Sequence, residues 1–123
     1  MLSMAFHNEL GKKGEDLATN FLLKKGFQIL ENNYRFLKAE VDIIALKGET
    51  LVAVEVKTRS TPEFGDPQDF LKPQQIKRLV KAVDHYVNER DLDVEVRFDV
   101  IAIIKNKMGT RIEHLEDAFL YFD

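Results

Sequence analysis

The chain has 123 residues, no cysteine and a formal net charge of −3, which fits one domain, residues 1–123, with a core of its own. The lack of cysteine excludes disulfide bonds, thiolate metal sites and a cysteine nucleophile, and no apolar run is long enough to span a membrane. Residues 1–6 are too short for a signal-peptide core, so we expect a cytoplasmic protein.

The charge is distributed unevenly along the chain. Residues 1–81 carry 13 Lys and Arg against 11 Asp and Glu, whereas residues 82–123 carry 5 against 10. The first part therefore has room for a local phosphate-binding surface, although the whole chain does not have the strongly basic charge typical of nucleic-acid binders.

The first predicted element is a helix over residues 8–25, with Asn8 as a candidate N-cap. Gly11 and Gly14 each cost a helix about 1 kcal/mol relative to alanine, so we expect close packing or a bound group on that face. Glu15 lies at the border of the apolar stripe and could point toward a sheet. An ordinary solvated glutamate in the first helical turn is the more frequent explanation.

A strand is predicted at residues 27–36, followed by an antiparallel β-hairpin. The aliphatic runs 41–46 and 51–56 flank the polar turn 47–50, which is the usual pattern of a hairpin. Both runs are apolar on both faces near the turn, and this indicates a sheet that is covered on both sides.

The register of this hairpin brings four charged residues together. Asp42 is predicted opposite Glu55, and Glu40 opposite Lys57. Residues two apart on a strand share a face, so all four side chains should gather in one patch. Two opposed carboxylates at a partly buried position are destabilising. Either a divalent cation such as Mg²⁺ or a structural ion-pair cluster with Lys57 would compensate them.

A loop at residues 59–72 and a helix from Pro73 to about Glu89 follow the hairpin. Loops of this length are more often functional than merely connective, and Arg59 at its start is a candidate substrate contact. Several basic residues fall mainly off the apolar stripe of the helix. They suit a phosphate backbone, although such a charge run is most often a solvated face. These residues are Lys72, Lys77, Arg78 and Lys81.

Residues 94–104 are predicted to form an apolar strand. The predicted helix carries the chain back between the 51–56 strand and this one. The two strands should therefore run parallel, joined by a right-handed crossover. Asp99 within it is expected to pair with Arg97. A short strand at 110–115 comes last. An aromatic tail follows it and could pack on the core or on a partner. Its aromatic residues are Phe119, Tyr121 and Phe122.

Common alternative chemistries have no support in the sequence. The three histidines lack the spacing of zinc ligands, and no P-loop, dinucleotide fingerprint or serine-hydrolase elbow occurs.

Five short motifs are spread over residues 11–100: Gly11-x-x-Gly14-Glu15-x-x-Ala18, Asn33-Tyr34-Arg35, Glu40-Val41-Asp42-Ile43-Ile44, Val54-Glu55-Val56-Lys57-Thr58-Arg59 and Arg97-Phe98-Asp99-Val100. Together they resemble the YraN-like family, which is related to Holliday-junction resolvases and to the PD-(D/E)XK nuclease superfamily. Two positions depart from the usual pattern: no proline precedes Asp42, and Ala39 stands where the YraN-like family usually has glycine.

The resemblance implies an α/β, restriction-endonuclease-like fold, with a three-layer core of a mixed β-sheet flanked by helices. By the same resemblance, Asp42, Glu55 and the Val56 carbonyl would hold Mg²⁺ or Mn²⁺. Lys57 would orient the attacking water or stabilise developing negative charge, and Glu15 would assist at the metal site. These roles agree with the general chemistry of metal-assisted phosphodiester hydrolysis.

The function implied is a metal-dependent endonuclease that hydrolyses DNA phosphodiester bonds at branched or single-stranded structures, as a homodimer and without membrane attachment. The alternative is a non-catalytic nucleic-acid-binding or complex-assembly protein on the same fold. A third interpretation is a protein-interaction module that uses the aromatic tail.

Overall fold

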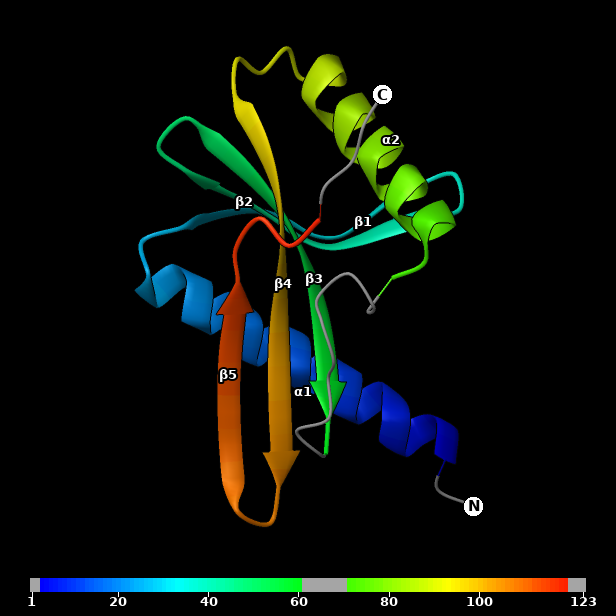
Figure 1. The fold of residues 1–123 in the computed structure, drawn as a ribbon, viewed down its shortest axis with the longest axis vertical. Coiled ribbons are helices and arrows are strands. Elements are labelled where there is room, and N and C mark those ends of the chain that lie inside the picture. The colour runs from blue at the N-terminus through cyan, green and yellow to red at the C-terminus, as the bar shows by residue number, and fades with distance from the viewer. Residues whose placement is uncertain (1–2, 61–70, 120–123) are drawn as a thin grey trace.

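The computed structural model describes residues 3–60 and 71–119, with side chains from residue 12 onward. A five-stranded sheet lies between two helices, which confirms the predicted α/β class (Figure 1). The elements in chain order are α1 (Ser3–Lys24), β1 (Gln28–Phe36), β2 (Ala39–Lys47), β3 (Thr50–Arg59), α2 (Pro73–Glu89), β4 (Glu95–Asn106) and β5 (Gly109–Leu115).

The strands follow one another across the sheet in the order β1-β2-β3-β4-β5. Only β3 and β4 pair in parallel, and the other neighbours are antiparallel. The chain passes from β3 to β4 through α2, so the predicted crossover is confirmed. The α1 helix crosses behind the sheet in Figure 1, whereas α2 lies in front of it.

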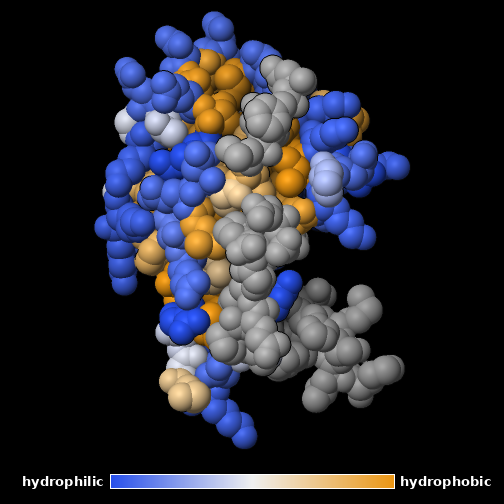
Figure 2. All heavy atoms as spheres, in the orientation of Figure 1, coloured by the Kyte–Doolittle hydropathy of each residue, from blue (hydrophilic) through white to orange (hydrophobic). Residues whose placement is uncertain are grey.

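Each face of the sheet has its own apolar core. On the α1 face, Ala18 and Leu22 pack with Ile43, Val54 and Ile101. A second set of buried residues joins the other face to α2, and its helix members are Leu79, Ala82, Val83 and Tyr86. Hydrophilic residues dominate the margins of the molecule, and hydrophobic residues show mainly toward the middle (Figure 2). The sheet is therefore covered on both sides, as the two-sided apolar strands predicted.

The first helix is longer than predicted. It begins at Ser3, which places Asn8 inside the helix, so the N-cap prediction is wrong. Residues 3–7 include no proline or glycine, and a residue type that favours caps does not by itself end a helix. The predicted second helix, Pro73–Glu89, is confirmed at both ends, with proline in the first turn.

Gly14 brings α1 close to β3. A Cβ atom built at Gly14 would overlap the Thr58 hydroxyl and lie 3.3 Å from the Thr58 Cβ. The predicted close packing on this helix face is thus confirmed at Gly14. The contact also holds the neighbouring Glu15 against the sheet.

We expect Gly14→Ala to lower the free energy of unfolding. Overpacking of this kind costs about 1–3 kcal/mol, more than the gain of about 1 kcal/mol in helix propensity. Urea denaturation of Gly14→Ala, Thr58→Ala and the double variant would measure the coupling. Removal of the Thr58 hydroxyl should recover at least about 0.5 kcal/mol of the loss. Strictly additive effects would contradict the close approach.

Asp99 is the centre of a buried polar network. Arg97 donates two hydrogen bonds of 2.9 Å to its carboxylate, as predicted, and the Asp117 backbone N–H donates a third. His114 Nε2 lies 2.7 Å from the same carboxylate, and its Nδ1 lies 2.9 Å from the Lys25 ammonium. A neutral histidine protonated at Nε2 satisfies both partners. This network fastens β5 and the following segment to β4.

The C-terminal segment folds back onto the sheet. The Ala118 N–H donates to the Phe98 carbonyl at 2.7 Å, and Phe119 is buried in the core on the α2 side. Phe119 is therefore not available as an exposed contact, and Tyr121 and Phe122 lie outside the described residues. Neither helix of the described residues has the length and apolar character that a membrane crossing needs.

Candidate active site

The predicted hairpin register is confirmed close to the turn. Lys47 pairs with Thr50 and Ile43 pairs with Val54, where the ladder between β2 and β3 ends. Beyond this point the β1–β2 ribbon turns away from β3 and β4 (Figure 1). The predicted pairs that involve Asp42 and Glu40 would lie past the end of the ladder.

The alternation of side chains on β2 breaks where the ladder ends. Val41 packs in the core under α2, whereas Ile43 packs in the core under α1. In an uninterrupted strand these two residues would point to the same face. The strand therefore changes face at Asp42, which lies between them.

A matching break occurs on β1. Asn32 donates a 3.2 Å hydrogen bond to Thr19 on α1, and the next residue, Asn33, lies close to Glu15 on the same helix. Asn33 has a φ of +56°, in the left-handed region that asparagine adopts more readily than most residues. By register Asn33 faces Asp42. The backbone of both strands is therefore irregular at the position of Asp42.

Asp42 and Glu55 meet at this break. The Val56 N–H donates a 2.8 Å hydrogen bond to Asp42 Oδ2, which directs this carboxylate toward β3. Asp42 lies close enough to Glu55 for its charge to act on that carboxyl group. Glu55 is a buried carboxyl group, and its Oε1 atom has no hydrogen-bond partner. An unsatisfied buried oxygen of this kind needs a donor or a cation.

The pKa values of the pair reflect this environment. Burial, and then the charge of Asp42, raises the pKa of Glu55 to about 9. Burial also raises the pKa of Asp42, against the hydrogen bond from Val56 and the charge of Lys57. The two carboxyl groups therefore share a proton near neutral pH, as two close acids do when no cation separates them.

Glu15 reaches the same region from α1. Burial raises its pKa, and the charge of Asp42 raises it further. In the amide orientation that satisfies both acids, Asn33 donates to Glu15 Oε2 at 3.2 Å and to Glu40 Oε1 at 3.0 Å. The structure thus places Glu15 near Asp42, although an ordinary solvated glutamate was the more frequent explanation from the sequence alone, and Asn33 bridges Glu15 to Glu40.

Lys57 and Glu40 do not pair as predicted. Lys57 is half-buried, and its charge acts on both Asp42 and Glu55. Glu40 instead faces Arg35 across the β1–β2 ladder and forms a 3.4 Å ion pair with it. The divergence of β2 from β3 is the reason, because it carries Glu40 away from Lys57 while Asp42 stays within reach.

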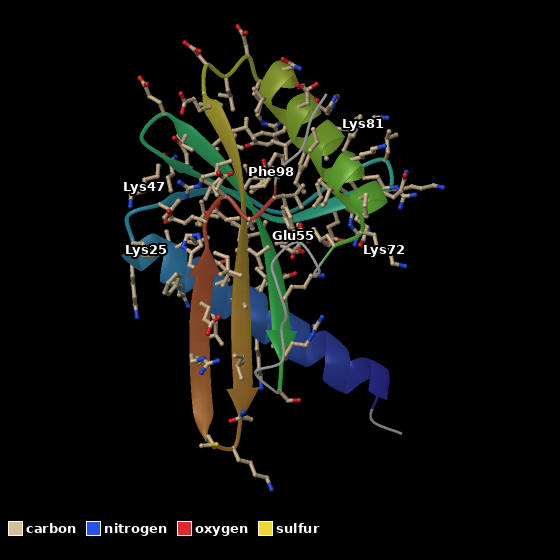
Figure 3. All side chains as sticks on the ribbon, viewed as in Figure 1. Lys25, Lys47, Glu55, Lys72, Lys81 and Phe98 are labelled. Atoms are coloured by element: carbon tan, nitrogen blue, oxygen red, sulfur yellow. The ribbon has the colours of Figure 1, made fainter. Side chains whose placement is uncertain are left out.

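The predicted nucleic-acid contacts are all exposed, one at the end of β3, one just before α2 and three on α2. The Arg59 guanidinium donates to the neighbouring Thr58 carbonyl at 2.9 Å. Glu55 lies near the start of α2, Lys72 lies just before that helix and Lys81 lies on it (Figure 3). Of the four basic residues at and on α2, Arg78 and Lys81 line the hollows beside the acidic pair.

Glu55 opens into a small hollow between the sheet and α2. It has a volume of about 100 Å³, and Glu40, Arg78 and Leu79 are among its lining residues. The buried carboxylate is therefore reachable from the surface on the side of the basic helix.

The chemistry of the donor atoms fits a hard divalent cation. Among the described residues, no three Asp, Glu, His or Cys side chains group closely enough to hold a metal by themselves. Mg²⁺, however, usually takes only one or two protein carboxylates and completes its shell with water and phosphate oxygens. Asp42, the orphan oxygen of Glu55 and a backbone carbonyl such as that of Val56 meet that requirement.

Sequence reasoning missed Asn33. Asparagine is depleted in strands, so two consecutive asparagines within a predicted strand were a signal of irregular backbone.

These features define an α/β protein with a mixed five-stranded sheet and a buried acidic pair where the sheet divides. The model of a family described as "Uncharacterised protein family UPF0102" matches residues 14–103, a span that includes every acidic site residue. The chain belongs to this family.

Similar proteins cover nearly the whole chain. A UPF0102 protein of Christiangramia forsetii is 72% identical over 119 residues, which are 97% of this chain and 100% of that protein. One from Flavobacterium psychrophilum is 60% identical over the same shares. A third, from Parabacteroides distasonis, is 42% identical over 94% of this chain and 96% of its own length.

Proposed function

We propose that this protein is a metal-dependent endonuclease that hydrolyses DNA phosphodiester bonds, with branched or single-stranded DNA as its substrate. The observation that carries the proposal is the meeting of Asp42 and Glu55 at the break in the sheet, with Lys57 beside them. Structural ion-pair networks also shift pKa values, but they do not usually leave a buried carboxylate oxygen without a partner.

The topology supports the finer fold assignment. A helix, an antiparallel three-stranded unit, a crossover helix and a parallel fourth strand follow one another here. This order agrees with the restriction-endonuclease-like core expected from the resemblance to PD-(D/E)XK nucleases. Asp42 falls on the second strand and Glu55 on the third, which agrees with a signature of Asp42 followed after a hairpin by Glu55-Val56-Lys57.

Each residue has a role in the proposed reaction. Asp42, Glu55 and the Val56 carbonyl would hold Mg²⁺ or Mn²⁺, which supplies Lewis-acid polarisation of the phosphate and a more acidic water. Lys57 places positive charge where negative charge develops on the phosphate oxygens. Glu15, whose pKa is raised, is suited to accept a proton from a water near Asp42.

We expect Mn²⁺- or Mg²⁺-dependent cleavage that Asp42→Asn and Glu55→Gln each reduce by at least about a hundredfold, since each removes a charged metal ligand. The measurement is a gel assay on forked, four-way, single-stranded and duplex DNA, with and without Mn²⁺. A second readout is the thermal midpoint, which Mn²⁺ should raise for the wild type and not for these variants.

The control is Glu49→Gln, an exposed acid in the β2–β3 turn, which should cleave like the wild type. Cleavage that persists in Asp42→Asn would identify a contaminating nuclease. DNA binding without cleavage or any metal response would instead favour the non-catalytic binding protein. Sedimentation of the free protein and the DNA complex would test the proposed homodimer, and cell fractionation the proposed cytoplasmic location.

A further inference from the structure

A second hollow lies between the β1–β2 turn and the first half of α2. This turn lies beside the start of the helix in Figure 1. The hollow has a volume of about 400 Å³, and Phe36, Leu37 and Ala39 supply its apolar surface. Ala39 and Arg78 line both this hollow and the smaller one that contains Glu55. The two hollows therefore adjoin, and the outer one leads to the acidic pair.

Leu37 occupies an unfavourable position in this turn. Phe36 pairs with Ala39, so Leu37 and Lys38 form a two-residue turn at the tip of the ribbon. The Leu37 side chain is 85% exposed, and its φ of +55° lies in the left-handed region where glycine or asparagine is usual. Neither apolar burial nor backbone preference explains a leucine at this tip.

The polar rim of the outer hollow is basic. Lys38 comes from the turn, and Arg78 and Lys81 come from one face of α2, three residues apart. Within the part of the chain that the structure describes, none of these three cations forms an ion pair with an acidic side chain. Gln74, one turn before Arg78, adds an amide that can donate and accept hydrogen bonds.

We infer that the outer hollow binds one unpaired DNA nucleotide next to the phosphate that lies at Asp42 and Glu55, with Leu37 as a wedge that keeps this nucleotide unstacked. This inference rests on the proposed endonuclease function and specifies its substrate. The base packs on Phe36 and Leu37, Gln74 faces its polar edge, and the cations contact the flanking phosphates. Apolar side chains that separate base steps and basic grooves that follow a single strand are both established devices of DNA-binding proteins.

The charge and size of the hollow decide against other occupants. If a second copy of this chain bound here, the same three cations would face one another unless acidic groups from elsewhere lay between them. A DNA strand instead supplies the opposite charge along its length. A hollow of about 400 Å³ holds a small ligand and not a duplex. The inference therefore places an unpaired strand at this position, as at a fork, a flap or a junction.

The test is binding without metal, so that cleavage plays no part. A fork carrying 2-aminopurine at the first unpaired position, and a duplex of equal length, are titrated with protein in EDTA. We expect the wild type to bind the fork at least about tenfold more tightly and to change the 2-aminopurine fluorescence. Leu37→Asn, which suits the left-handed backbone and should fold, is expected to lose this preference and the fluorescence change.

Met108→Asn is the matched control, because Met108 is a 96% exposed apolar residue in the β4–β5 turn. It should behave like the wild type. Arg78→Gln should weaken binding to fork and duplex alike and reduce the salt slope by about one. Equal wild-type affinity for fork and duplex, or equal behaviour of Leu37→Asn and Met108→Asn, would overturn the inference, as would a Leu37→Asn effect confined to self-association.

The same proteins separate this inference from the proposed function. If the hollow binds unpaired DNA but the protein is no nuclease, the fork preference persists and no metal produces cleavage. If the protein is a nuclease but the hollow has another role, fork and duplex are cut alike, and Leu37→Asn does not change that ratio.

Discussion

Glu55→Gln should make the protein more stable at neutral pH while abolishing metal-dependent cleavage. The folded protein holds Glu55 protonated, with a pKa of about 9 against 4.5 for an unperturbed glutamate, because the group is buried beside Asp42. Glutamine keeps the size of the side chain and has no proton to retain. We expect a gain of about 3 kcal/mol at pH 7, at order of magnitude.

The pH dependence of this gain has a defined sign. Between pH 4.5 and about 9, folded Glu55 binds a proton that the unfolded chain releases. The wild type therefore loses stability as the pH rises through this window, by up to about 1.4 kcal/mol per pH unit, and Glu55→Gln does not share that loss. The difference should be near zero at pH 4.5 and largest near pH 9.

Urea denaturation at a series of pH values, with metal removed by EDTA, would measure both curves. Glu49→Gln, in the exposed β2–β3 turn, is the control and should stay within about 0.5 kcal/mol of the wild type. A Glu55→Gln protein that is less stable than the wild type at pH 8 would show that the carboxyl group is not held protonated.

Asp99→Asn should destabilise the protein by about 3 kcal/mol, because it removes the charge of a fully buried acceptor and leaves donors around it unsatisfied. Asp99 is fully buried and accepts hydrogen bonds from Arg97, His114 and the Asp117 backbone. Asparagine has the same shape but no charge, and its amide nitrogen would face a donor. The loss should appear in the denaturation midpoint in urea.

Asp99 also contributes to the acid sensitivity of the fold. Burial opposes its ionisation, but the hydrogen bonds from His114, Arg97 and Asp117 outweigh burial and lower the pKa of Asp99 below 3.8. Its stabilisation is therefore present above that pH and is lost as the pH falls through the lower, folded value. Asp99→Asn should lose less stability than the wild type on acidification to pH 2.

A surface pair provides the comparison for Asp99. Arg111 and Glu113 lie 3.3 Å apart on β5 with both side chains largely exposed. Glu113→Gln should cost less than about 1 kcal/mol, as surface ion pairs generally do. Equal effects of the Asp99 and Glu113 substitutions would contradict the central role of the buried network.

Local patterns predicted most of the elements. The two apolar runs around the Lys47–Thr50 turn fixed the hairpin and its register at Ile43 and Val54. Proline at position 73 and the apolar stripe behind it defined α2 at both ends. These signals are local, because they depend on residue preference, periodicity and turn chemistry within a few residues.

The surroundings of the acidic pair were predicted less well. An ideal strand register puts Glu40 opposite Lys57, but β2 changes face at Asp42, and Glu40 pairs with Arg35 instead. Asn33 itself has a left-handed backbone and lies in register with that break, and for this reason it contacts Glu15. These backbone breaks depend on how the strands pack against both helices. The sequence of one strand does not contain that information.

Periodicity and spacing along the chain were enough to predict the α/β class, the order of the elements and the acidic residues on β2 and β3. The burial of Glu55 with an unsatisfied oxygen, the approach of Glu15 and the two adjoining hollows beside α2 became known from the folded protein. Burial and the pKa shifts that follow from it depend on which distant segments surround a group, and that is settled only when both helices pack against the sheet.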